Sequence, residues 1–260
     1  MVRGLETFRE YFAGFENQYV LIGGAACDIL FTSNEGQFRA TRDLDMVLIV
    51  EALTPEFGEK FWEFLEVGQY RNKAASTGKP QFYRFDKPAN ADYPKMIELF
   101  ARTDFELREM NGLTTIHIDD EVSSLSAILL NDDYYQTLLN GKVVVQGLSV
   151  LRPEYLVLFK AKAYLDLSAR KENGENIDSR DIKKLKNDIL RISAEFLLER
   201  VDELPESVHM DVKKFIEKLD GEPFDANLLN SYGLSNMDLV ERLCEMYGGY
   251  GKCMIEEQGM

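Results

Sequence analysis

The chain has 260 residues, of which 45% are hydrophobic and 29% are charged, as in ordinary globular proteins. Its formal net charge of −15 repels phosphate backbones, which argues against general nucleic-acid binding. The sequence has no apolar run near the ~18 residues that span a bilayer, and its N-terminus lacks the apolar segment of a secretion signal. We therefore expect a cytoplasmic protein without a membrane partner.

The first half of the sequence mixes helical and strand patterns. Apolar residues at helical spacing predict a helix over 5–15, and a short β-rich run over 18–22 ends at Gly23-Gly24. A helix over 25–31, a polar loop and an apolar strand over 44–50 follow. Thr54-Pro55 opens another helix, since proline is favoured in a first turn. Shorter strands are predicted at 81–85, 95–101, 114–118 and 142–146.

The second half is helical. The apolar pattern predicts helices over 153–170, 179–200, 207–219 and 235–247. Strands concentrated before residue 146 and helices after it indicate an α+β domain, a mixed sheet flanked by helices over 1–150, followed by a helical domain over 151–260.

The most informative segment contains Asp43 and Asp45. Residues two apart in a strand point to the same face, so these carboxylates project together and Leu44 points away. Adjacent carboxylates repel unless one is protonated or a cation lies between them. With three cysteines, two histidines and no CxxC pair, the sequence offers no zinc pattern. A hard cation held by oxygen atoms, Mg²⁺ or alternatively Mn²⁺, fits the pair. The competing interpretation is a solvated Asp-x-Asp.

The Gly23-Gly24 turn stands directly between a strand and a helix. Glycine lets a backbone approach a ligand closely, and the free N–H groups of a helix N-terminus favour phosphate. A tight strand-to-helix turn without any ligand explains the same residues. The fingerprints of Rossmann and P-loop phosphate sites are missing from the sequence.

Glu98 is flanked by apolar residues in a predicted strand, where an acid must be paired, bound to a ligand or at a strand end. It is either a third metal ligand or the base that takes a proton from an attacking hydroxyl. The structural alternative is an ion pair with Arg84 or Arg102.

Two features of the helical half concern charge. Lys160 falls within the apolar stripe of its helix, where an ammonium is costly without an anion. We expect it to contact nucleotide phosphates across the domain cleft; the alternative is a snorkelling side chain. Asp178, followed by Asp181, is interpreted as an N-terminal helix cap.

These motifs resemble the nucleotidyltransferase (DNA polymerase β-like) superfamily, and within it the AbiEii/AbiGii type found as toxins of type IV toxin–antitoxin systems. The likeness extends over about residues 18–190 and is concentrated in the Gly-Gly and Asp-x-Asp segments. It rests on Ile22-Gly23-Gly24-Ala25-Ala26, Arg39, Thr41-Arg42-Asp43-Leu44-Asp45, the strand around Glu98, the LVLFKAKA run from Leu156 and the DSRDIKK run from Asp178.

The resemblance implies a nucleotidyltransferase fold that moves a nucleoside monophosphate from a nucleoside triphosphate to a hydroxyl acceptor. Asp43, Asp45 and Glu98 would be catalytic and hold the metal, while Gly23, Gly24, Thr41 and Lys160 would bind nucleotide. RNA, protein and small-molecule acceptors all stay open, and a cognate antitoxin is an expected partner. The alternative is a non-catalytic nucleotide-binding or protein-partner module on the same fold.

Overall fold

The structure, a computed structural model, describes residues 2–49, 51–71, 84–102 and 132–248. The strand predicted at 114–118 lies outside these ranges. The chain divides into two compact units, Met1–Arg152 and Pro153–Met260.

In the described part of the first unit, six strands form one sheet in the order β3-β4-β2-β1-β6-β5. The strands are β1 (Tyr19–Ile22), β2 (Asp43–Leu48), β3 (Arg84–Asp86), β4 (Met96–Phe100), β5 (Lys142–Val145) and β6 (Leu148–Leu151). The helices of this unit are α1 (Leu5–Tyr11), α2 (Gly23–Ser33), α3 (Pro55–Gly68) and α5 (Asp132–Gly141).

The sheet is mixed. β1 lies between β2, to which it is antiparallel, and β6, to which it is parallel. β2 is parallel to β4 on its other side, and β3 and β5 close the two edges as antiparallel strands. The expected α+β class, with a mixed sheet flanked by helices, is confirmed.

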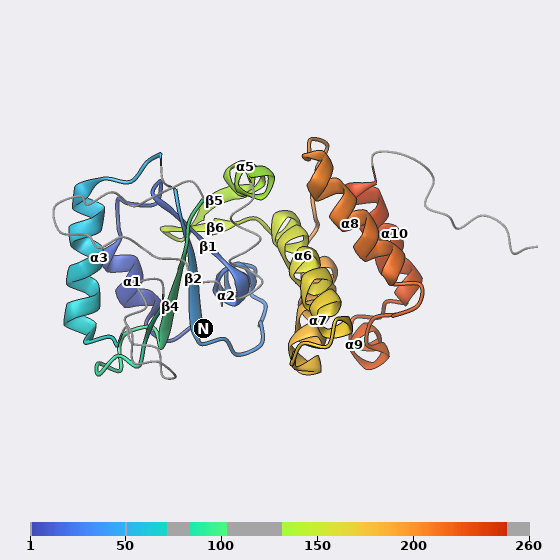
Figure 1. Ribbon diagram of the computed structural model, residues 1–260, viewed down its shortest axis with the longest axis horizontal. Helices are drawn as coiled ribbons and strands as arrows, with labels where there is room; N and C mark the ends of the chain where they lie inside the picture. Colours follow the sequence, from blue (N-terminus) through green and yellow to red (C-terminus); the bar gives the residue numbers. More distant parts are fainter. Residues whose placement is uncertain (1, 50, 72–83, 103–131, 249–260) are drawn as a thin grey trace, which may run out of the picture. The chain divides into compact units, whose positions relative to one another are not determined.

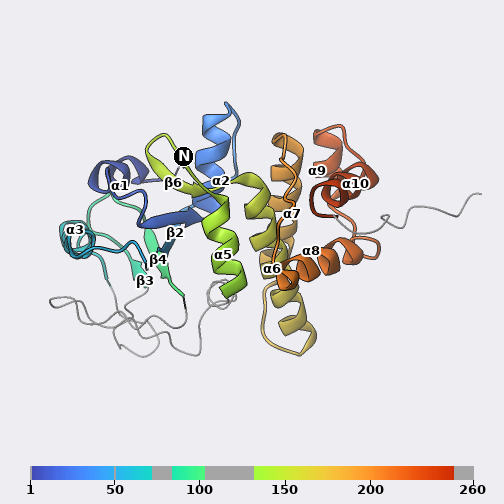
Figure 2. The same ribbon diagram turned by 90° about the horizontal axis from the view of Figure 1, so that it is seen from above.

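Helices cover both faces of this sheet: α1 and α3 lie on one side and α2 on the other (Figures 1 and 2). The first face is packed with aromatic rings because phenylalanines recur at helical spacing in α1 and α3. Phe12 lies 4.5 Å from Phe8 and 5.4 Å from Phe64, measured between ring centroids, and Tyr19 of β1 meets Phe8 at 5.5 Å. This aromatic cluster holds the strands that carry the acidic residues.

Most predicted elements are present, with shifted ends, and three were missed. Thr54 caps α3 by accepting a hydrogen bond from the Phe57 amide, with Pro55 in the first turn, as the sequence suggested. The missed elements are α5, β6 and the short helix α9 (Ala226–Ser231). Because β6 follows residue 146, the prediction that strands end there is wrong.

The second unit is helical. Besides α9 it contains α6 (Pro153–Glu172), α7 (Ser179–Glu195), α8 (Glu206–Lys218) and α10 (Asn236–Tyr247). α6 packs against α7 and α8, and α10 packs against the same two helices. Within the described residues, none of the helices combines the length and apolar character needed to cross a membrane.

Candidate active site

The strand register places the predicted acids on one face of the sheet. Asp45 of β2 stands opposite Glu98 of β4, and Asp43 is opposite Met96. Paired residues on neighbouring strands share a face, and strands lie about 4.8 Å apart. Asp43, Asp45 and Glu98 are therefore neighbours on what we call the acidic face. All three side chains are partly exposed, whereas Leu44 between the aspartates is fully buried.

The acidic face is the side of the sheet away from the aromatic cluster. Ile22, at the end of β1, pairs with Asp45 and so shares its face, while Leu21 pairs with Met46 on the other. Phe85 of β3 contacts Phe61 in the aromatic cluster. The alternation of each strand thus sends apolar residues to the core and the acids to the side of α2.

Glu98 has a cationic neighbour. The Nε of Arg84, its register partner on β3, lies 3.2 Å from a carboxylate oxygen of Glu98. Burial raises the pKa of Glu98; the charge of Arg84 lowers it and that of Asp43 raises it again, leaving it above the usual range. The ion pair that sequence reasoning offered as the structural alternative is therefore present. This ion pair holds the Glu98 carboxylate beside the aspartate pair.

The Gly-Gly turn touches this face. Gly23, the first residue of α2, has a φ of 64°, a left-handed conformation that favours glycine. A Cβ atom there would lie 2.1 Å from Oδ2 of Asp45, and one at Gly24 would lie 2.4 Å from the hydroxyl of Thr41. A side chain at either glycine would therefore displace an oxygen atom, that of Asp45 in one case and that of the predicted Thr41 in the other.

The start of α2 has the properties of an anion site. Its first turn contains no acidic residue, and its N-cap, Ile22, supplies no side-chain hydrogen bond to the free amides. Helix amides without such caps, together with the positive end of the helix dipole, attract phosphate oxygens. Amides that can bind an anion therefore lie next to carboxylates that can bind a cation, at Gly23 and Asp45.

The ligand atoms that the acidic face offers indicate whether a metal ion fits there. Carboxylate oxygens are the ligands that Mg²⁺ prefers, and Mg²⁺ uses one or two of them together with waters and substrate phosphates. Among the described residues, however, no group of three or more His, Cys, Asp or Glu lies close enough to hold a metal ion. Asp43 and Asp45 thus suit a Mg²⁺ ion as a pair, while Glu98 is held by Arg84.

Lys160 of α6 lies in the helical unit and is almost fully buried. Its ammonium donates to Oδ2 of Asp188, on α7, at 2.9 Å, and Asp188 is completely buried. Arg191 approaches the other oxygen of Asp188 at 3.8 Å. The anion that Lys160 requires is therefore present inside this unit, and the predicted contact with phosphate stays a prediction.

Asp178 and Arg170 have structural roles at helix ends. Asp178 caps α7 by accepting from the Arg180 amide, which confirms the helix-cap interpretation. Arg170 pairs with Glu175 at 2.7 Å near the end of α6. Sequence reasoning missed Asp188, although its spacing of three from Leu185 and four from Ile192 places it on the apolar stripe of α7.

Comparison with protein-family models, with curated proteins and with solved structures finds no match to this chain. A function for the protein therefore has to follow from the geometry of the acidic face.

Proposed function

We propose that the protein is a Mg²⁺-dependent nucleotidyltransferase with its active site on the acidic face. The observation that carries the proposal is the register of Asp45 with Glu98, beside Asp43 and against the glycine turn that begins α2. At this place the helix amides can bind the oxygens of a phosphate chain, and the carboxylates can bind the metal ion that accompanies it.

Each side chain has a defined part in this proposal. Asp43 and Asp45 would hold Mg²⁺, which when bound neutralises phosphate charge and orients the triphosphate. The amides of Gly23 and Gly24 bind phosphate oxygens, with the Thr41 hydroxyl beside them. Glu98 is suited to accept the proton of the acceptor hydroxyl, because its pKa is raised by burial and by Asp43. Arg84 orients the Glu98 carboxylate.

The acceptor and the biological role rest on the resemblance alone. An RNA, a protein or a small molecule could supply the hydroxyl group, and a toxin with a cognate antitoxin is the role that the AbiEii/AbiGii likeness suggests. The non-catalytic alternative uses the same residues to bind nucleotide without transferring it. Transfer, rather than binding, distinguishes the two.

The first test is protection against heat by ATP, GTP, CTP and UTP, each with Mg²⁺. At least one nucleotide should raise the unfolding temperature of the wild type, and of Asp92→Asn, which alters an exposed carboxylate in the loop before β4. Asp43→Asn/Asp45→Asn should lose this response. Equal responses of all three proteins, or none with any nucleotide, would sink the proposal.

The second test is release of pyrophosphate from the protecting nucleotide in the presence of cellular RNA, protein or small-molecule fractions. The enzyme should release pyrophosphate with one fraction, and Glu98→Gln should slow the release more than it weakens binding. Protection without release from any fraction favours the binding module.

A further inference from the structure

The helical unit contains a pocket of about 680 Å³. It lies between the C-terminal half of α6, the N-terminal half of α7 and the segment between α8 and α9, and none of the residues of the acidic face lines it. Pockets that bind small molecules in proteins have volumes of about 300–1,000 Å³. The pocket is thus large enough for a ligand of nucleotide size.

The acidic side chains lining this pocket already have cationic partners. Asp225 receives the ammonium of Lys183 at 2.8 Å. Glu172 receives that of Lys218 at 3.1 Å, and Glu222 lies 3.8 Å from the same ammonium. The negative charge at the wall is therefore largely compensated by lysines 183 and 218.

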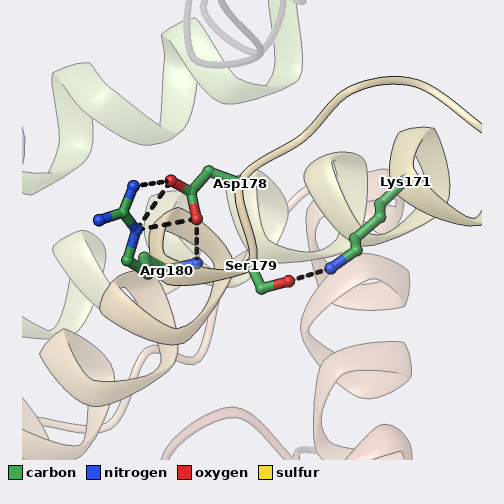
Figure 3. Close-up of polar contacts among 4 residues, drawn as sticks. All are labelled: Lys171, Asp178, Ser179 and Arg180. Carbon is green, nitrogen blue, oxygen red and sulfur yellow. Dashed lines mark hydrogen bonds and ion pairs between the residues drawn. The ribbon is translucent and has the colours of Figure 1, made fainter.

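Two further lysines of the wall donate their hydrogen bonds to neutral groups. Lys171 donates to the hydroxyl of Ser179, the first residue of α7 (Figure 3). Lys186 donates to the carbonyl of Glu222 at 3.1 Å and lies 5.8 Å from the Tyr164 ring centroid. Within the described residues, neither ammonium has a carboxylate within 4.0 Å. Counting Lys218, the pocket thus has four ammonium groups beside three carboxylates, in a protein whose net charge is −15.

Two further observations concern the charge at this wall. Figure 3 shows that the Asp178 carboxylate is hydrogen-bonded to Arg180, and the Lys171 ammonium acts on it only through its charge. Burial lowers the pKa of Lys186 more than the nearby charge of Glu222 raises it, and the charge of Lys183 lowers it further; a bound anion would raise it again.

We propose that this pocket binds a small organic phosphate, whose phosphate group accepts hydrogen bonds from Lys171 and Lys186. Phosphate matches two ammonium groups in charge, and lysine is a common phosphate-binding residue. The site is separate from the acidic face and does not depend on the proposed transferase activity.

Calorimetric titration of the full chain in EDTA tests this site without a contribution from metal ions. The probes are inorganic phosphate, ribose 5-phosphate and AMP, with adenosine as the uncharged comparison. At least one organic phosphate should bind more tightly than inorganic phosphate, and adenosine should not bind. Lys171→Gln and Lys186→Gln should each weaken binding at least tenfold, whereas Lys186→Arg should retain most of it.

Two controls make the outcome decisive. Lys184→Gln removes an exposed lysine of α7 that does not line the pocket, and it should leave binding unchanged. Asp43→Asn/Asp45→Asn should also bind normally, which separates this site from the acidic face. The proposal is overturned if none of the three phosphates binds at millimolar concentration, if the lysine substitutions change nothing, or if the aspartate variant loses binding.

Discussion

Charged side chains lie on largely apolar faces in both units, but the two units balance them differently. In the helical unit, Lys160 and Asp188 are both buried and form an ion pair 2.9 Å long. In the first unit, Asp43, Asp45 and Glu98 lie side by side, and Arg84 of the sheet pairs with the glutamate. The first arrangement pairs opposite charges, and the second gathers like charges on one face.

The difference shows what a charged residue in an apolar pattern can indicate. A buried ion pair satisfies its own electrostatics and is weak evidence for a ligand site. Like charges on neighbouring strands repel one another, and a bound cation or a proton reduces that repulsion. The acidic face, rather than Lys160, is therefore the better candidate for chemistry.

Breaking the ion pair gives the largest expected effect. Lys160→Met leaves the Asp188 carboxylate buried, and removing one partner of such a pair costs about 3–5 kcal/mol in the free energy of unfolding. Chemical denaturation measures this cost, and Lys160→Met/Asp188→Leu should recover much of it. Lys184→Met, at an exposed position of α7, serves as the control.

A different result would reverse the comparison. If Lys160→Met leaves stability almost unchanged and instead abolishes protection by nucleotides, Lys160 is the phosphate ligand that its place in the apolar stripe first suggested. The pairing with Asp188 would then be a secondary contact.

The glycine turn gives an intermediate effect. Gly23→Ala forces a left-handed φ on alanine, which costs about 1–2 kcal/mol, and adds a Cβ that overlaps the Asp45 carboxylate, at about 1–3 kcal/mol more. Gly14→Ala is a matched control, since Gly14 also has a positive φ, 90°, but a Cβ there meets nothing within 4 Å. Equal losses of unfolding free energy would mean that the contact between Gly23 and Asp45 is unimportant.

Local patterns in the sequence were enough for most elements and for the direction of the acids. The alternation of Asp43, Leu44 and Asp45 correctly separates one buried side chain from two partly exposed ones. β6 was missed because its four residues, Leu148–Leu151, are all buried and show no alternation. The glycine in the turn before it was a usable signal. Gln146 and Gly147 both have positive φ values, as the two-residue turns that join hairpin strands often require.

Contacts between distant segments could not be predicted in this way. Asp45 and Glu98 are 53 positions apart, and only the pairing of β2 with β4 makes them neighbours. Lys160 and Asp188 are on different helices, and each apolar stripe alone shows one unexplained charge. The pair could have been predicted by comparing the apolar stripes of the two helices, because one stripe contains a lysine and the other an aspartate.

The smallest effect concerns the pH dependence of stability and sharpens the comparison at Glu98. Because its pKa is raised in the folded protein, the folded state binds the proton more tightly than the unfolded chain does. The stability from this proton is complete below the ordinary pKa of 4.5 and is lost as the pH rises through the folded value. Glu98→Gln should flatten the fall in unfolding free energy above pH 4.5, with a change at pH 7 within about 1 kcal/mol because the Arg84 pair is lost as well.

Saturating Mg²⁺ should flatten the wild-type curve if the ion reduces the repulsion on this face. Identical pH profiles for wild type and variant would mean that Arg84 alone balances Glu98, and the acidic face would then resemble the compensated pair of the helical unit.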